Sequence, residues 1–129
     1  MKLTEKEIQN ILRLAAFERY KYFIKRVADF EFMFGLKDKH QNLALAELDG
    51  KILLSLWSAK EFAELSAIEE WYGYSPFEIN LNYFEREIIP YAKKNGCLLN
   101  VFPTSDRTGF IVTLEEFVRD LNIELEKYE

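Results

Sequence analysis

The dipeptide Asp49-Gly50 lies between two apolar runs, and it constrains the fold more than any other feature of the sequence. The runs cover residues 43–48 and 51–57. A two-residue hairpin turn requires positive φ angles, which Asp and Gly adopt readily, so the spacing predicts a β-hairpin. The second arm is almost continuously apolar instead of alternating, which is typical of a strand covered on both faces. We therefore expect this arm to lie inside a sheet.

Capping boxes predict where four helices begin. A side-chain oxygen at the N-cap accepts a hydrogen bond from the third helical amide, and a Glu at that third position reaches back. The pairs with this spacing are Thr4 with Glu7, Ser58 with Glu61, Asn82 with Glu85, and Thr113 with Glu116. The helix that begins after Ser58 is expected to continue to Trp71.

Two helical patterns near the N-terminus do not align on one straight helix. Their apolar positions are Ile8, Ile11, Leu12 and Ala15 in the first, and Phe17, Tyr20, Ile24, Val27 and Ala28 in the second. The two sets point in different directions, which predicts a break near residues 14–17. We interpret residues 1–14 as a helical appendage and residues 17–129 as the core of the domain. The appendage packs either on its own domain, the favoured alternative, or on a second copy in a homodimer.

The remaining elements follow from local periodicity and turn residues. A period-two pattern places Phe30, Phe32, Phe34 and Leu36 on one face of a first strand, and with the hairpin this strand predicts a three-stranded meander. Downstream we expect a strand at 77–81, a helix capped by Asn82 and interrupted at Pro90, strands at 98–102 and 110–112, and a last helix. The buried stripe of that last helix is Leu114, Phe117, Val118, Leu121, Leu125 and Tyr128.

The expected order of elements is α-α-β-β-β-α-β-α-β-β-α. This order indicates an α+β fold with a mixed, mainly antiparallel sheet and helices packed on it. A length of 129 residues is the size of one domain, so we expect a single domain over residues 1–129. No repeat, low-complexity stretch or linker interrupts the chain.

Charge and cysteine content restrict the classes of function. The formal net charge of −5 argues against a nucleic-acid binder, because phosphate contacts need a basic face. The only cysteine is Cys97, so no disulfide forms within the chain, as is usual in a reducing cytosol. The start of the chain lacks the apolar core of a signal peptide, and no apolar run is long enough to span a bilayer. We expect a cytoplasmic protein that does not contact a membrane.

Residues typical of catalysis or metal binding do not form a set in this sequence. His40 lies in a polar loop without a partner to position it, and Cys97 follows a helix stop, where a buried thiol is expected. One His and one Cys cannot complete a zinc site, and the five glycines form no phosphate-binding loop. We therefore predict no catalytic residue, no metal and no cofactor.

Aromatic residues around one strand end and one turn are the main candidates for binding. These residues are Trp57, Trp71, Tyr72 and Tyr74. Tyr and Trp are enriched at interfaces, although packing at the edge of the core explains them more simply. A second candidate is the loop 103–109, in which Arg107 has the chemistry to hold an anion or a partner's carboxylate. Packing and solvation remain the simpler interpretations for both.

Several short motifs together resemble those of a bacterial family described as domain of unknown function 2750. They include 19–26 (Arg-Tyr-Lys-Tyr-Phe-Ile-Lys-Arg), Trp57 followed by Glu-Phe-Ala at 61–63, Ile-Pro at 89–90 and Val-Phe-Pro at 101–103. The likeness runs from about Phe17 to the C-terminus. The order of elements is also similar, more faintly, to the module of the enhanced-serine-sensitivity proteins. The resemblance implies a cytosolic bacterial binding module and brings no catalytic residue.

Two functional hypotheses follow from these observations. The first is a non-enzymatic protein-interaction module of the immunity or regulatory type, whose acidic surface favours a basic partner. The second is a small-molecule-binding protein or enzyme with a pocket lined by Trp57, Trp71 and Tyr74.

Overall fold

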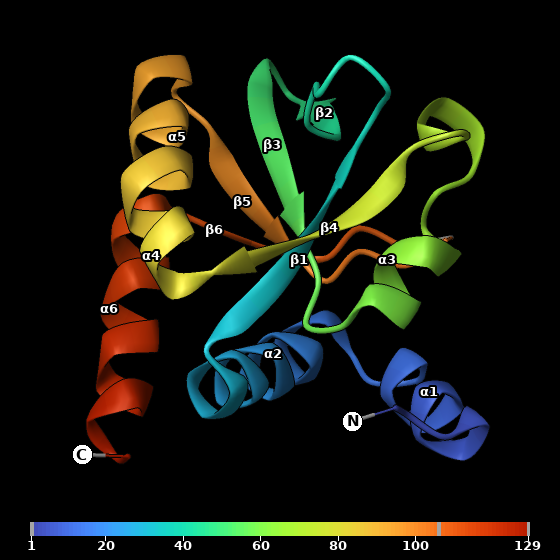
Figure 1. Cartoon of the computed structure of the whole chain (residues 1–129), viewed down its shortest axis with the longest axis vertical. Helices are drawn as coiled ribbons and strands as arrows, with labels where there is room; N and C mark the ends of the chain where they lie inside the picture. Colours follow the sequence, from blue (N-terminus) through green and yellow to red (C-terminus); the bar gives the residue numbers. More distant parts are fainter. Residues whose placement is uncertain (1, 106, 129) are drawn as a thin grey trace.

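The computed structural model describes residues 2–105 and 107–128. The protein consists of two β-sheets surrounded by helices (Figure 1). The strands are β1 (Phe32–Lys37), β2 (Leu45–Leu48), β3 (Lys51–Leu56), β4 (Ser75–Asn80), β5 (Leu98–Val101) and β6 (Phe110–Val112). The α-helices are α1 (Glu5–Leu12), α2 (Ala16–Phe30), α3 (Lys60–Leu65), α4 (Leu81–Tyr83), α5 (Ile89–Asn95) and α6 (Leu114–Glu126). A 3₁₀-helix, η1 (Glu69–Trp71), and a π-helix, η2 (Phe84–Ile88), complete the chain. The α+β class and the predicted order of strands and helices are confirmed.

The predicted hairpin is formed by β2 and β3, which pair antiparallel. Asp49 and Gly50 have φ angles of 51° and 77°, the positive values that the turn requires. On its other side β3 pairs in parallel with β5, and the sheet order is β2-β3-β5-β6. The inner position of the apolar arm is therefore confirmed.

The predicted three-stranded meander is wrong, because β1 pairs with β4 in a separate antiparallel sheet. β1 reaches the larger sheet only at its margin, where Phe34 and Trp57 exchange backbone hydrogen bonds of 2.8 Å. Figure 1 shows β1 and β4 lying across the tip of β3. After the polar loop that contains His40, Leu43 and Ala44 make backbone contacts with the end of β1. The chain then continues into the β2–β3 hairpin.

The residues predicted to share one face of β1 are not buried alike. Phe30 still belongs to α2, and Glu31 ends that helix with a left-handed φ of 65°. Leu36 is buried and Phe32 and Phe34 are half-buried, while Met33, on the other face, is buried as well. Periodicity identifies two faces without identifying which face the rest of the chain covers.

Two of the four predicted capping boxes are confirmed, at Thr4 with Glu7 and at Thr113 with Glu116. The box at Asn82 with Glu85 is wrong, because Asn80 caps that helix. The box at Ser58 with Glu61 is also wrong, because the N-cap of α3 is Ala59 and the Ser58 hydroxyl makes no capping hydrogen bond. The chain stays extended through Ala59, and Ser58 is carried into the interior. The helix also stops at Leu65 instead of reaching Trp71.

The helical segment between β4 and β5 begins earlier than predicted. Asn80, not Asn82, caps α4, and its side chain accepts a hydrogen bond from the Tyr83 amide. The predicted interruption at Pro90 is confirmed as a restart, since the π-helix η2 ends and Pro90 lies in the first turn of α5. Gly96 ends α5 with a left-handed φ of 63°, as expected of a glycine at the end of a helix.

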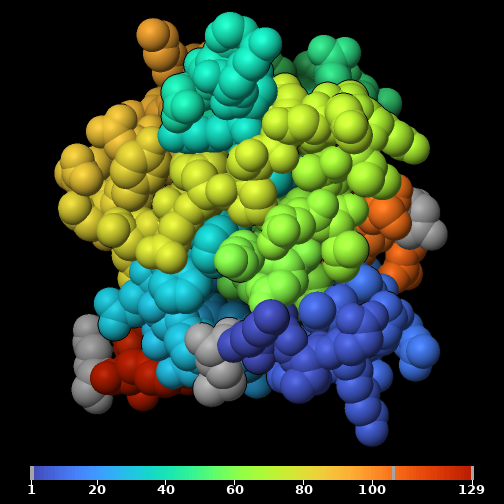
Figure 2. Space-filling model, turned by 45° about the vertical axis from the view of Figure 1, so that its right-hand side comes forward, coloured from blue at the N-terminus to red at the C-terminus, as the bar shows by residue number. Residues whose placement is uncertain are grey.

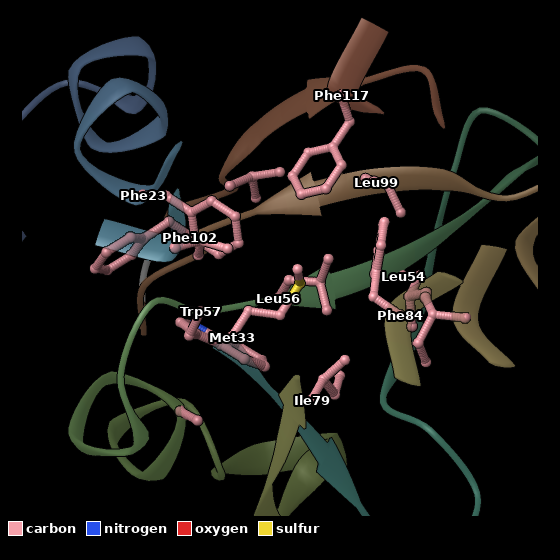
Figure 3. Close-up of a cluster of buried hydrophobic side chains, with 14 of the residues drawn as sticks. Phe23, Met33, Leu54, Leu56, Trp57, Ile79, Phe84, Leu99, Phe102 and Phe117 are labelled. Carbon is pink, nitrogen blue, oxygen red and sulfur yellow. The ribbon is translucent and has the colours of Figure 1, made fainter. Parts of the chain in front are cut away.

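Side chains from both sheets and from α2 and α6 fill one core (Figure 3). Its aromatic contacts include Phe23 with Phe117 at 5.8 Å and Phe62 with Phe102 at 4.6 Å between ring centroids. The appendage α1 packs on this core through half-buried residues, which are Ile8, Ile11 and Leu12. The break before α2 is confirmed, and a homodimer through α1 stays a prediction.

Candidate functional site

A cleft of about 300 Å³ lies where the parallel strands β3 and β5 end. One wall is formed by residues 66–71, which include η1, and the other by residues 103–105, 107 and 108. The carboxyl ends of parallel strands are a common place for binding sites in open α/β sheets. We call this hollow the loop cleft.

The two tryptophans fix the floor of the loop cleft. Trp57 donates from Nε1 to the Pro103 carbonyl at 2.9 Å, and the Ser66 hydroxyl donates to the same oxygen at 3.4 Å. The Trp57 and Trp71 rings pack edge to face, with centroids 5.9 Å apart. Trp71 in turn donates from Nε1 to the Leu45 carbonyl at 3.3 Å. These contacts join both walls of the cleft to the edge of the sheet.

The wall that begins at Pro103 is supported by side-chain hydrogen bonds of β5 and β3. Asn100 accepts from the Gly109 amide at 2.9 Å and donates to the Ser55 hydroxyl at 3.2 Å. Phe102, directly before the wall, has a positive φ of 63°, which is unusual for an aromatic residue. The loop therefore leaves β5 in a sharply turned and well-supported conformation.

Arg19 supports the same wall from inside the core, a role that no pattern in the sequence predicted. It is fully buried on α2, and its guanidinium donates to three backbone carbonyls. The acceptors are Phe102 at 3.0 Å, Leu14 at 2.5 Å and Thr108 at 3.3 Å. Its position four residues before Phe23, on the buried stripe of the helix, is the signal that could have indicated this role.

The five residues predicted to bind are separated by the structure. Trp57 is fully buried beneath the loop cleft, whereas Trp71 and Arg107 line it. Tyr72 is 85% exposed outside the cleft, and Tyr74 is half-buried against the core. Arg107 is exposed, but its Nη2 donates to the carbonyls of Leu12 at 2.8 Å and Leu14 at 3.2 Å. Arg107 thus holds the end of α1 against the cleft.

Replacing Trp57 by Phe is expected to reduce the free energy of unfolding by about 2 kcal/mol. The change removes the hydrogen bond to the Pro103 carbonyl and leaves space under Trp71. Urea unfolding would show the loss as a lower midpoint at an unchanged m-value. A midpoint equal to that of the unchanged protein would contradict the proposed role of Trp57 as the cleft floor.

An acidic surface adjoins the loop cleft. A second hollow, of about 320 Å³, lies between α1 and α3. The acidic surface consists of the exposed carboxylates around the two hollows and two exposed apolar side chains; its members are Glu5, Glu64, Leu65, Ile68, Glu69 and Glu70. In Figure 2 the green α3 lies beside the blue N-terminal helix, and the orange loop is at its edge.

Among the described residues, the four carboxylates of the acidic surface form no ion pairs. Leu65 is 48% exposed and Ile68 is 39% exposed. Glu69 has a left-handed φ of 54°, a costly conformation for a non-glycine residue. The surface therefore combines negative charge, exposed apolar area and a strained turn.

Other residues with reactive chemistry lie away from both hollows. Cys97 is buried, and this burial raises the pKa of its thiol, which disfavours the reactive thiolate. His40 is in an exposed loop, where its backbone amide donates to Asp38 at 2.8 Å. Within residues 2–105 and 107–128, no three His, Cys, Asp or Glu side chains are grouped so that they could hold a metal.

In the same residues, no helix has the length and apolarity to cross a membrane.

Comparison with known proteins gives one match to a family. The model of the family described as "Protein of unknown function (DUF2750)" matches residues 20–121. The match covers the two sheets and most of α2 and α6, and it leaves α1 outside. The resemblance inferred from the motifs is thereby confirmed. No curated protein matches the chain.

Proposed function

The chain belongs to the DUF2750 family, and from this premise we propose that it is a non-enzymatic protein-interaction module of the immunity or regulatory type. Its partner is a protein that presents a basic segment to the acidic surface. The observation that carries the proposal is the exposure of Leu65 and Ile68 among four carboxylates that have no ion-pair partner. We place this module in the bacterial cytoplasm, in agreement with the single buried cysteine.

Each part of the acidic surface has a physical role in this proposal. Unneutralised carboxylates attract a basic partner over several ångströms and make association fast and sensitive to salt. Exposed apolar side chains supply the area whose burial stabilises the complex once it has formed. The wall at 66–71 is fixed by Trp71 and by Ser66, so little ordering is needed on binding.

Reversing two charges on this surface tests the proposal. The chain carrying Glu69→Lys and Glu70→Lys is used to capture partners from a lysate of the native cells at low and high salt. We expect a reproducible basic partner whose capture falls about tenfold in the double variant and falls with salt for the unchanged chain.

A matched control carries Glu85→Lys and Glu126→Lys, which make the same change in net charge at exposed positions on η2 and α6. In Figure 1, α6 and the helical segment from α4 to α5 lie on the left, and α3 lies on the right. The control should capture the partner as the unchanged chain does. Recovery of no reproducible partner, or equal loss in both double variants, would count against the proposal.

A small-molecule site in the loop cleft is the alternative, and the cleft volume of about 300 Å³ favours it. Trp71 of the predicted aromatic pocket lines this volume, together with Arg107 of the second candidate loop. A ligand there would change the fluorescence of Trp71, so a metabolite screen read by tryptophan emission, with Trp71→Phe as control, distinguishes the two functions. Trp57 packs on Trp71 and also emits, so an emission change that is undiminished in Trp71→Phe would reject the cleft as the binding site.

A further inference from the structure

A larger cavity, of about 570 Å³, lies on another part of the molecule, between α2, β1 and the start of α3. Its volume is in the range usual for small-molecule sites. In Figure 2, α2 and α3 meet on the face turned to the viewer. Its lining includes Arg26, Phe30, Phe32, Phe34, Ser58 and Lys60. We call this cavity the Arg26 pocket, and none of its residues lines the loop cleft.

Two polar groups without partners both belong to the Arg26 pocket. Among the described residues, the buried side-chain nitrogen and oxygen atoms that lack a hydrogen bond are Arg26 Nε and Ser58 Oγ. Ser58 is 4% exposed, so its hydroxyl has little access to water. Buried polar groups are nearly always hydrogen-bonded, because an unsatisfied one costs about 1–3 kcal/mol. That both exceptions line one cavity indicates an acceptor that binds there.

The lining of the pocket is also aromatic. Phe32 and Phe34 pack edge to face with centroids 5.5 Å apart, and Phe30 is 6.2 Å from Phe32. The Arg26 guanidinium lies 4.5 Å from the centre of the Phe30 ring. Stacking on that ring fixes the guanidinium plane by a cation–π contact and leaves its edges for hydrogen bonds.

The charges that line the pocket favour an anion of low charge. Lys2, Arg26 and Lys60 are cationic, and Glu61 and Glu64 are anionic. Glu61 is engaged with the N-terminal segment, because it accepts from the Leu3 amide at 3.4 Å. A doubly charged phosphate would be repelled by the two glutamates, and it would leave the aromatic wall without a partner.

We propose that the Arg26 pocket binds a small aromatic carboxylate. The Arg26 Nε–H and the neighbouring guanidinium N–H form the edge that binds one carboxylate through two hydrogen bonds. The Ser58 hydroxyl donates to the same carboxylate, and the ring of the ligand packs on Phe32 and Phe34. Of the acidic surface only Glu64 also lines this pocket, and neither Arg26 nor Ser58 belongs to that surface, so the ligand site does not rest on the protein-interaction function.

Phenylacetate is the probe for this proposal, and 2-phenylethanol is its neutral counterpart. Binding to the full chain is followed by amide chemical shifts in ¹⁵N-labelled protein. We expect saturable shifts at Phe32, Phe34, Ser58 and Lys60, and about tenfold weaker binding of the alcohol. The absence of saturable shifts at these amides, or equal binding of the two compounds, overturns the proposal.

Three substitutions assign the binding to the named groups. Arg26→Gln is expected to weaken phenylacetate binding about tenfold, and Ser58→Ala about threefold. Lys25→Gln removes the same charge from the adjacent exposed position of α2 and should change binding less than about twofold. Ser58→Ala deletes a hydroxyl that has no partner, so this variant keeps the fold and decides the question even if Arg26→Gln is unstable. Equal affinity of Ser58→Ala and the unchanged chain would contradict the proposed geometry.

Discussion

Replacing Arg19 by Met is expected to lower the free energy of unfolding by about 4 kcal/mol. The side chain is fully buried, and it donates to the carbonyls of Phe102, Leu14 and Thr108. Met fills a similar volume but supplies no donor, so buried carbonyl oxygens lose their hydrogen bonds. Such a loss is a large fraction of the total stability of a domain of this size. Urea unfolding followed by circular dichroism measures it.

A surface arginine supplies the control for this prediction. Arg119→Met removes the same group from α6, where the guanidinium is mostly exposed and pairs with Asp120 at 3.3 Å. Exposed pairs contribute about 0–1 kcal/mol, so this variant should unfold at nearly the same urea concentration as the unchanged chain. Equal losses in the two variants would mean that the buried hydrogen bonds of Arg19 contribute no more than a surface charge.

Gly109→Ala is expected to cost about 3 kcal/mol, because a methyl group has no room at this position. A Cβ atom built on Gly109 would lie 2.3 Å from the Val101 carbonyl oxygen and 2.8 Å from Asn100 Oδ1. The first of these is backbone in β5 and cannot turn away. Either the strand or the loop must move, and the hydrogen bond of 2.9 Å between the Gly109 amide and Asn100 is then lost. Thermal and urea unfolding should both show the change.

Gly50→Ala separates this steric effect from the general cost of replacing glycine. Gly50 has a φ of 77°, and a Cβ atom there would meet nothing within 4 Å. Its replacement should cost only the left-handed backbone strain, about 1–2 kcal/mol. If Gly109→Ala is no more destabilising than Gly50→Ala, the close approach of Gly109 to Val101 does not constrain the fold.

Part of the candidate site follows from local sequence, and part does not. Trp71 and Arg107 were selected by residue type, and they line the same cleft. Trp57 was selected for the same reason, but its neighbours cover it completely. Residue type indicates that an aromatic side chain will contact something, whereas only the packing of other segments decides whether that contact is the core or a ligand.

The sequence by itself determined the features whose causes lie within a few residues. The turn at Asp49-Gly50, the capping boxes at Thr4 and Thr113, and the helix stop at Gly96 each depend on one local backbone conformation or one short hydrogen bond. The order of the elements is the sum of such local causes. These interactions form where the packing of the rest of the chain leaves the same groups free, which is why they could be predicted from local sequence.

The tertiary structure alone decided which of several compatible partners each segment takes. β1 pairs with β4 across more than thirty residues of chain, and that choice determines that Met33 is buried and that Phe32 and Phe34 face the Arg26 pocket. The same packing carries Ser58 inside, where local spacing predicts a cap. Pairing and burial depend on the free energy of the whole arrangement, because each strand face and each polar group competes for partners that are distant in sequence.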